Sequence, residues 1–391
     1  MVNSRRQALV QTREFNRDVF LNESWQKKPA LIKALWDPWR NPLDPDELAG
    51  LACEAEVEAR LVTQARGTYA VEHGPFDADR FADLHQEPWT LLVQGVDHHV
   101  PNVSALLNFF RFVPNWRIDD VMVSYAVDQG GVGPHYDQYD VFLVQGMGKR
   151  LWQIGARCNE QSELLPHHDL RLLAQFEPVQ EWLLEPGDVL YVPPGIAHNG
   201  VAVGDDCMTY SIGFRAPSRA DLVSHWADHV VEQLNDDDRY TDPDLMVQAN
   251  PGEITAETLA RLQAMLSEKL LDGHAFARWF GSYNTMAKNP SVDWSPESTI
   301  DTIDLRALPA PVTLERNPAC RFAFVRESDD GVTLFVDGEA YACSGTSARF
   351  AERICAVDCT TIDAADITSQ EMVALIVQLL NLGSIAIAEE D

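Results

Sequence analysis

Residues 130–199 constrain the fold of this chain more than any other stretch, because they hold two histidines and an aspartate in a pattern that suits one metal ion. His135 and Asp137 are separated by a single residue, and His198 follows far downstream. Two imidazoles and one carboxylate form the facial triad that binds non-haem Fe(II) and leaves coordination positions open for chemistry. The pattern therefore predicts an iron site with His135, Asp137 and His198 as its ligands.

The spacing of these candidates has a physical reason. Side chains on a strand repeat with a period of two, so a strand over residues 135–145 would direct His135 and Asp137 to the same face. His198 follows a Pro-Pro-Gly turn that ends the apolar run 189–192, which places it at the end of another strand. A bare His-x-Asp also occurs by chance, and two surface or capping polar residues are the alternative interpretation of that pair alone.

Short strand-like runs separated by Gly and Pro turns fill residues 89–214. The predicted strands are 89–95, 117–126, 141–145, 149–154 and 208–214, with a helix over 104–112 and a turn over 146–148. Many short strands of this kind are typical of a double-stranded β-helix, or jelly roll, and argue against a helical or doubly wound fold.

Arg150 is the candidate partner of a cosubstrate. In the predicted strand 149–154 it shares a face with Trp152, which favours the interior. A 2-oxoacid chelates iron through its keto oxygen and adjacent carboxylate, and its far carboxylate needs a bidentate cation. Arg150 meets that need, and Lys149 is the alternative if the register is one residue off. An arginine on the solvent side of the strand end is the other interpretation.

Two further polar residues lie on or near the predicted strand 117–126. Ser124 shares a face with Met122, and it is either a satisfied core hydroxyl or part of the pocket lining. Asp128 precedes a Gly-Gly turn near the expected pocket mouth. It is an acidic candidate for substrate contact, with a turn-forming aspartate as the alternative.

The formal net charge of −30 bears on the partners of the protein. Such a field repels nucleic acid and attracts a basic protein, although a general bias of the source proteome would look the same. The 7 cysteines are scattered without a C-x-x-C pair, so neither a disulfide framework nor a zinc site is predicted. No apolar run is long enough to cross a bilayer, and residues 1–16 lack the apolar core of a signal peptide. We therefore predict a cytoplasmic protein.

The segment before the predicted jelly roll, residues 1–88, is expected to be mainly helical. One helix has Asp44 as N-cap and Pro45 at its first position, and it is predicted to run to about Ala59. The strands of the central domain are expected to begin near Glu87.

The chain beyond residue 215 divides into two predicted parts. Residues 216–288 form a helical region with apolar stripes on helices 219–234 and 255–271. Residues 289–391 begin with a loop and continue with short strands and helices in an order that suggests a winged-helix-like domain. A winged helix often binds DNA, but DNA binding needs a basic face, and residues 371–380 carry no Lys or Arg. We therefore predict a structural or protein-contacting domain.

Four longer motifs resemble those of the bacterial JmjC ribosomal oxygenases. They are residues 20–21 with 25–29 (FL and WQKKP), 89–94 (WTLLVQ), 112–120 (FVPNWRIDD) and 133–142 (GPHYDQYDVF). The similarity extends over essentially the whole chain and is far more specific than His-x-Asp alone. It implies an α+β protein with a JmjC, or cupin-type, double-stranded β-helix at residues 89–215.

The resemblance also implies roles for individual residues. His135, Asp137 and His198 match the ligands of Fe(II), and Arg150 with Ser124 matches the positions that hold the cosubstrate 2-oxoglutarate. The implied activity is that of a 2-oxoglutarate- and Fe(II)-dependent dioxygenase that uses O₂. Within the family, arginine hydroxylases modify the β-carbon of an arginine in large-subunit (50S) ribosomal protein sixteen, and a basic ribosomal protein is thus the implied substrate.

The family resemblance further implies a homodimer formed through the helical region 216–288, and a C-terminal winged-helix-like domain. Two other classes of function remain open. One is a JmjC hydroxylase or demethylase of another basic protein, which would share every iron and cosubstrate residue. The other is a non-enzymatic cupin-like binding protein, against which the complete set of ligands and the interior arginine argue.

Overall fold

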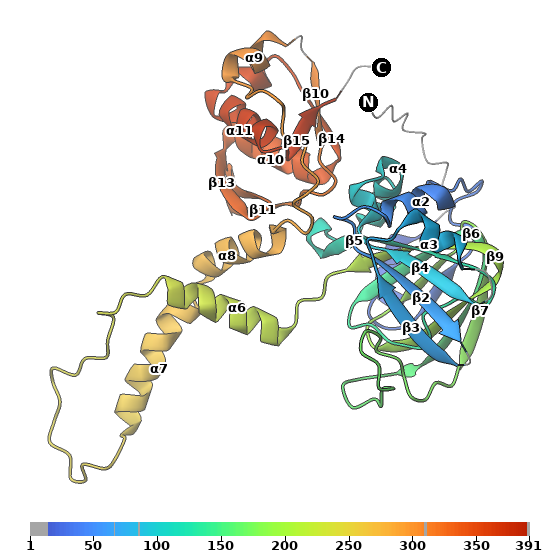
Figure 1. Cartoon of the computed structure of the whole chain (residues 1–391). Coiled ribbons are helices and arrows are strands. Elements are labelled where there is room, and N and C mark those ends of the chain that lie inside the picture. The colour runs from blue at the N-terminus through green and yellow to red at the C-terminus, as the bar shows by residue number, and fades with distance from the viewer. Residues whose placement is uncertain (1–14, 66, 85–86, 309–310, 389–391) are drawn as a thin grey trace. The chain divides into compact units, whose positions relative to one another are not determined.

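The structure is a computed structural model that describes residues 15–388 apart from 66, 85–86 and 309–310. The described chain forms two compact units, and Figure 1 colours their elements along the chain. The first unit holds the chain up to Ala216 together with Lys288–Asp293 and Asn317–Ala319, and the second holds the remainder. Residues 1–14, on which the expectation about a signal peptide rests, lie outside the described residues.

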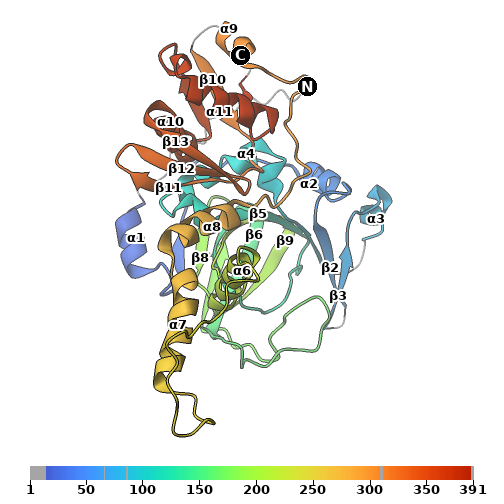
Figure 2. The ribbon, with the colours of Figure 1, turned by 90° about the vertical axis from the view of Figure 1, so that its left-hand side faces the viewer.

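A nine-stranded antiparallel sheet is the framework of the first unit. Its order is β1-β8-β6-β9-β5-β4-β2-β3, with β7 paired to β6, and Figure 2 shows the β2–β3 hairpin at the end of this order. The strands are β1 (Ala30–Ile32), β2 (Ala59–Ala65), β3 (Thr68–His73), β4 (Trp89–Val93), β5 (Ile118–Ala126), β6 (Asp140–Arg157), β7 (Gln180–Leu184), β8 (Val189–Val192) and β9 (Ile196–Phe214).

The two longest strands, β6 with 18 residues and β9 with 19, pair with each other along their length. We expected a turn over residues 146–148 and a separate strand over 208–214, and both expectations are wrong. Register shifts between Gln145 and Lys149 bend the pair without ending it. Gly148 permits this bend, because its φ is +57° and a Cβ there would lie 2.7 Å from the carbonyl oxygen of Asp206.

The strand expected over residues 135–145 is shorter than predicted, since β6 begins at Asp140. His135 lies outside it and forms an isolated antiparallel bridge with His198. Asp137 is likewise outside any strand, and its carbonyl oxygen accepts from Gly195 N at 2.7 Å. His135 and Asp137 are therefore not brought together by the period of two along a strand. Backbone hydrogen bonds to the segment around His198 hold them instead.

Side chains of β6 alternate between two cores, as a two-faced strand requires. Val141 and Leu143 face one buried cluster with Leu190 of β8, whereas Phe142 and Val144 face the largest cluster. Aromatic rings fill that larger cluster: Phe142 lies 5.4 Å from Phe20, 4.8 Å from Phe110 and 4.9 Å from Tyr191, ring centre to ring centre. The N-terminal helical segments therefore cover the outer face of the jelly roll.

The helices of the first unit are short. They are α1 (Arg17–Glu23), α2 (Pro45–Leu51), α3 (Ala78–Ala82), α4 (Pro101–Ser104) and α5 (Leu107–Phe110), with 3₁₀ turns η1 (Val96–His98) and η2 (Asn115–Arg117). The start of α2 is as predicted: Pro45 is its first residue, and Asp44 N donates to Glu47 Oε2 at 3.0 Å as part of a capping box. Its end at Leu51 is earlier than expected. The helix predicted over 104–112 is also shorter, since only α5 lies wholly within that range and α4 ends at Ser104.

The expectation that the strands of the central domain begin near Glu87 is also corrected, because β1, β2 and β3 of the same sheet lie before it. β2 pairs with both β3 and β4, so these strands extend the main sheet well before Glu87. Pairing with a distant strand here outweighs local helix propensity.

A buried carboxylate fastens the N-terminal segment to the start of β6. Asp140 is fully buried and accepts from Arg117 Nη2 at 3.0 Å, Tyr191 Oη at 2.6 Å and Gln26 Nε2 at 3.0 Å. Arg117 lies over the ring of Trp25 at 5.7 Å. Both oxygens of the Asp140 carboxylate, three residues after Asp137, therefore accept hydrogen bonds.

The second unit contains helices and two three-stranded sheets, β14-β10-β15 and β11-β12-β13. Its elements are α6 (Arg219–Glu232), α7 (Ala256–Leu270), α8 (Gly273–Thr285), α9 (Thr302–Ala307), β10 (Val312–Arg316), β11 (Phe322–Ser328), β12 (Gly331–Val336), β13 (Glu339–Ser344), α10 (Gly345–Ala356), β14 (Cys359–Ile362), η3 (Asp366–Thr368), α11 (Gln370–Asn381) and β15 (Ile385–Ile387). The two predicted helices and the loop after residue 288 are present. Across the described residues, no helix combines the length and the apolar character that a bilayer crossing needs.

We expect Asp140→Ala to lower the free energy of unfolding of the first unit by roughly 3–5 kcal/mol, because it leaves a largely buried guanidinium without its carboxylate. Urea titration measures this change. Glu72→Ala is the matched control, since it removes the carboxylate on the β2–β3 hairpin that pairs with Arg80 of α3. It is expected to change the free energy by about 1 kcal/mol or less. Equal effects of the two substitutions would contradict the importance given to the buried group.

Candidate metal and cosubstrate site

The structure brings His135, Asp137 and His198 into one cluster. One nitrogen or oxygen atom of each lies within 4.8 Å of the others, a separation suited to a single ion. The two imidazole ring centres are 4.3 Å apart, and His198 Nε2 lies 3.6 Å from Asp137 Oδ2. The three residues that the sequence singled out as ligands are therefore close enough to share a metal.

Backbone contacts orient the two imidazoles. His135 Nδ1 lies 2.9 Å from the carbonyl oxygen of Gly133, and His198 Nδ1 lies 2.9 Å from that of Ile196. A carbonyl can only accept, so each Nδ1 carries the proton and each Nε2 keeps a lone pair. The two histidines also exchange backbone hydrogen bonds of 3.0 and 2.8 Å. Both rings are thus preset to bind a cation through Nε2.

The electrostatics of His198 favour the neutral form that a metal requires. Burial is the main cause that lowers its pKa to about 4, and the neighbouring His135 acts in the same direction. The carboxylate of Asp137 acts oppositely but does not prevail. At neutral pH the imidazole of His198 is therefore uncharged.

Arg150 is carried into the interior, as predicted. Only 4% of its surface is exposed, and its guanidinium lies 5.8 Å from the ring centre of Trp152. Nε contacts Cys207 Sγ at 3.4 Å, whereas the buried Nη2 has no hydrogen-bond partner among the described residues. A buried guanidinium nitrogen without an acceptor is costly, and the far carboxylate of a 2-oxoacid would satisfy it. The residues present therefore fit such a cosubstrate.

Lys149, the alternative to Arg150, points the other way. Its ammonium pairs with Glu185 Oε1 at 2.6 Å, and about half of each side chain is exposed. Asp128 is also exposed, and its Oδ1 accepts from Gly204 N of β9 at 2.7 Å. The register of β6 thus selects the arginine for the interior.

A row of buried polar side chains crosses three neighbouring strands beside Arg150. Thr209 Oγ1 donates to Gln145 Oε1 at 3.1 Å, and Gln145 Nε2 donates to the carbonyl oxygen of Met147 at 2.7 Å. Ser124 lies opposite Thr209, and its hydroxyl is 3.5 Å from the Thr209 carbonyl oxygen. Ser124, a predicted site residue, is therefore buried on the same face of the sheet as Thr209.

Sequence reasoning missed Gln145, Thr209 and Cys207 as members of this interior. A signal was available for Gln145, because it follows Val141 and Leu143 at a spacing of two and so continues their inward face. No comparable signal marked Thr209 and Cys207, since their partners come from other strands.

Close packing around the triad explains a glycine in β9. A Cβ at Gly200 would lie 2.7 Å from ring carbons of Trp152, and the Trp152 ring centre is 5.9 Å from that of His198. Any larger residue would displace the tryptophan that lies between His198 and Arg150. Next to this region, a cavity of about 390 Å³ is lined in part by Tyr69, Gly133 and Asn199. It borders the residues that flank both histidines.

Comparisons with known proteins agree with this geometry. Residues 105–222 match the model of the JmjC domain, and residues 268–386 match that of the ROXA-like winged helix. The ribosomal protein uL16 3-hydroxylase of Escherichia coli K12 is 40% identical over 290 residues, which cover 73% of this chain and 77% of that protein.

Solved structures extend the similarity to nearly the whole chain. The X-ray structure of E. coli YcfD has a TM-score of 0.85 at 34% identity, and it covers 97% of this chain and 99% of that one. The structure of the ribosomal oxygenase YcfD in complex with cobalt and 2-oxoglutarate has a TM-score of 0.83 at 33% identity, with 96% and 99% covered. These matches confirm the predicted jelly roll and winged helix. The chain belongs to the JmjC ribosomal oxygenases, and it is a 2-oxoglutarate- and Fe(II)-dependent dioxygenase.

Proposed function

We propose that this enzyme hydroxylates the β-carbon of an arginine in a basic protein of the large ribosomal subunit. The observation that carries the proposal is the 40% identity, over 73% of this chain, to a ribosomal protein uL16 3-hydroxylase. Position 3 of an amino acid is its β-carbon. The net charge of −30 is consistent with this substrate, because an acidic enzyme attracts a basic protein.

His135, Asp137 and His198 hold Fe(II) in this proposal, with Nε2 of both imidazoles and one carboxylate oxygen as donors. Arg150 holds the far carboxylate of 2-oxoglutarate, and Ser124 lines the same pocket. Bound iron and cosubstrate supply the oxidising chemistry: one atom of O₂ enters the substrate C–H bond, and the other enters succinate as 2-oxoglutarate loses carbon dioxide. The protein residues bind, orient and keep water out of a largely buried site.

The winged-helix domain contacts protein in this account and does not bind DNA. Helix α11 carries no Lys or Arg, and its apolar side chains are buried in the core of the domain. A DNA-binding face needs cations to neutralise phosphates. Because ribosomal proteins are made in the cytoplasm, we place the enzyme there as well.

The enzyme is a homodimer in this account, formed through α6, α7 and α8. Leu259, Leu262, Leu266 and Leu270 form a stripe along α7, and all four are exposed. An uncovered stripe of this kind marks an interaction surface, because burying it removes apolar area from water.

Mass spectrometry of ribosomal proteins tests the proposed substrate. We expect deletion of the gene to remove one oxygen atom from an arginine of a large-subunit protein. Wild type restores the modification, and His135→Ala does not, because it removes one iron ligand. His168→Ala is the matched control, since His168 is an exposed histidine outside the site. If the ribosomal proteins are unchanged while purified enzyme still consumes 2-oxoglutarate, the substrate is another basic protein.

A binding experiment tests the role of Arg150. We expect Arg150→Ala to raise the Kd of the cobalt-loaded protein for 2-oxoglutarate by at least about 30-fold, since it removes one partner of a buried charge pair worth roughly 2 kcal/mol or more. Cobalt binding itself is retained. Lys149→Ala removes the neighbouring exposed cation and is expected to leave the Kd unchanged. Calorimetry that finds equal losses for both variants would contradict the assignment.

A further inference from the structure

The buried guanidinium of Arg150 is held by a sulfur atom. Its Nε donates to Cys207 Sγ at 3.4 Å, and its Nη2 has no partner among the described residues. No acidic side chain in that part of the chain pairs with Arg150. Arg150 is 4% exposed and Cys207 is fully buried. Because buried charges are ordinarily paired with an opposite charge, a thiol is an unusual partner for this cation.

An irregularity in β9 brings Cys207 to Arg150. In the ladder with β6, pairing stops at Val203 and resumes at Met208, so residues 204–207 have no partner in β6. Cys207 pairs with β5 instead, and its side chain packs in a small buried cluster of alanines beside Arg150. Extra residues of this kind re-aim a side chain without ending the ladder. The sulfur is therefore the acceptor that this apolar surrounding offers to Nε.

A second donor fixes the sulfur from another strand. Gln145 Nε2 donates to Cys207 Sγ at 3.5 Å and to the carbonyl oxygen of Met147 at 2.7 Å. Gln145 Oε1 accepts from Thr209 Oγ1 at 3.1 Å, so the amide presents its nitrogen to the sulfur. Two N–H groups thus converge on Sγ, which acts as an acceptor in this site.

The geometry of a guanidinium explains what the contact achieves. The group is planar, so holding its Nε–H also fixes the directions of the Nη groups. The ring of Trp152, whose centre is 5.8 Å from the guanidinium carbon of Arg150, packs against the same group. A carboxylate at position 207 would bind the guanidinium bidentately and compete with the cosubstrate. A thiol sulfur is a weak acceptor, and it holds Nε without engaging Nη2.

We propose that Cys207 is a positioning residue for 2-oxoglutarate: its sulfur orients the guanidinium of Arg150 and leaves Nη2 for the far carboxylate. Cys207 acts through Arg150 and does not itself touch the cosubstrate. This inference rests on the proposed role of Arg150 and adds the residue that makes this role possible.

Binding of two 2-oxoacids to the cobalt-loaded protein tests the proposal. We expect Cys207→Ala to raise the Kd for 2-oxoglutarate by about 5-fold or more, because Arg150 loses the acceptor that orients it. The Kd for pyruvate, which has no far carboxylate, is expected to stay unchanged. Cys207→Ser keeps an acceptor at the same place and is expected to remain within about 2-fold of wild type for both acids. The visible absorption of bound cobalt measures chelation by either acid.

A double substitution shows whether Cys207 acts through Arg150. In the Arg150→Ala protein, Cys207→Ala is expected to have no further effect on the Kd for 2-oxoglutarate, since both substitutions interrupt the same contact. Cys53→Ala is the matched control for the loss of a thiol. The Cys53 thiol donates to the carbonyl oxygen of Ala49 on α2, and its removal is expected to leave both Kd values unchanged.

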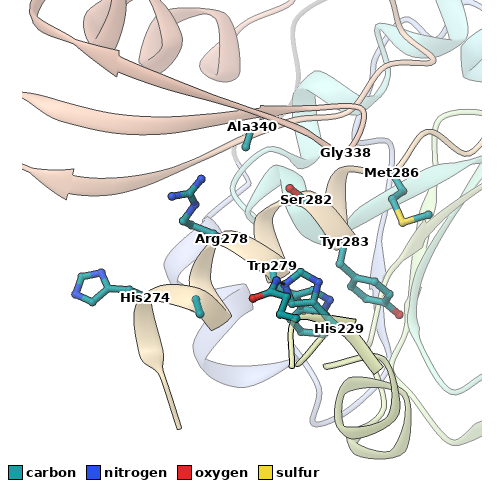
Figure 3. Close-up of a pocket in the computed structure, with 11 residues that line it drawn as sticks. His229, His274, Arg278, Trp279, Ser282, Tyr283, Met286, Gly338 and Ala340 are labelled. Atoms are coloured by element: carbon teal, nitrogen blue, oxygen red, sulfur yellow. Dashed lines mark hydrogen bonds between the residues drawn. The ribbon is translucent and has the colours of Figure 1, made fainter. Parts of the chain in front are cut away.

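A second arginine provides the control for binding of the dicarboxylate elsewhere. Arg278 is exposed and lines a cavity of about 700 Å³ on α8 (Figure 3). An accessible cation beside a cavity of that size can also bind a dicarboxylate. None of the residues that line this cavity belongs to the iron site. Arg278→Ala is therefore expected to leave the cobalt absorption change and the Kd unaltered.

The outcomes separate this inference from the proposal on which it rests. An unchanged Kd for 2-oxoglutarate in Cys207→Ala, while Arg150→Ala weakens binding, overturns the positioning role and leaves the cosubstrate site standing. Equal losses for 2-oxoglutarate and pyruvate also overturn it, because distortion of the whole site would cause them. Binding by Cys207→Ser as weak as that by Cys207→Ala does the same, since packing would then be what is lost. If Arg150→Ala binds 2-oxoglutarate like wild type, the role of Arg150 fails and this inference fails with it.

Discussion

The antiparallel pairing of β6 with β9 is the constraint on which the site depends. His135 and Asp137 lie just before β6, and His198 lies at the start of β9. The bridge between the two histidines therefore forms only when these strands are in register. Further along the same pair, Arg150 lies opposite Ala202. One ladder of backbone hydrogen bonds therefore sets both the metal ligands and the arginine of the cosubstrate pocket. A slip by one residue would turn Arg150 outward and Lys149 inward.

Burial gives these groups their chemical character. His198 is neutral because charging it inside the protein is unfavourable, and that neutrality is what allows it to bind a metal. Arg150 has a buried guanidinium nitrogen without a hydrogen-bond partner among the described residues, which a carboxylate would satisfy. Asp140, by contrast, is satisfied by protein donors on every side. The carboxylate of Asp140, which stabilises the fold, is thus satisfied within the protein, whereas the guanidinium of Arg150 keeps a nitrogen for the cosubstrate.

Much of this could be predicted from the sequence, and the failures have a common cause. The three ligand candidates, the inward Arg150 and the capped start of α2 depend on local spacing, which a sequence displays. The supposed turn at 146–148 is a bulge, and the end of α2 is decided by pairing of β2 with distant strands. Gln145 and Thr209 were missed because each is satisfied by a residue on another strand. Contacts between distant segments are what a single sequence does not show.

Crystals of the protein grown with cobalt and 2-oxoglutarate provide the most direct test of the account, through anomalous scattering at the cobalt edge. The account predicts one strong peak bound by Nε2 of His135 and His198 and by the carboxylate of Asp137. It also predicts the far carboxylate of the cosubstrate on the guanidinium of Arg150. A peak away from these three residues, or a cosubstrate whose far carboxylate avoids Arg150, would contradict it.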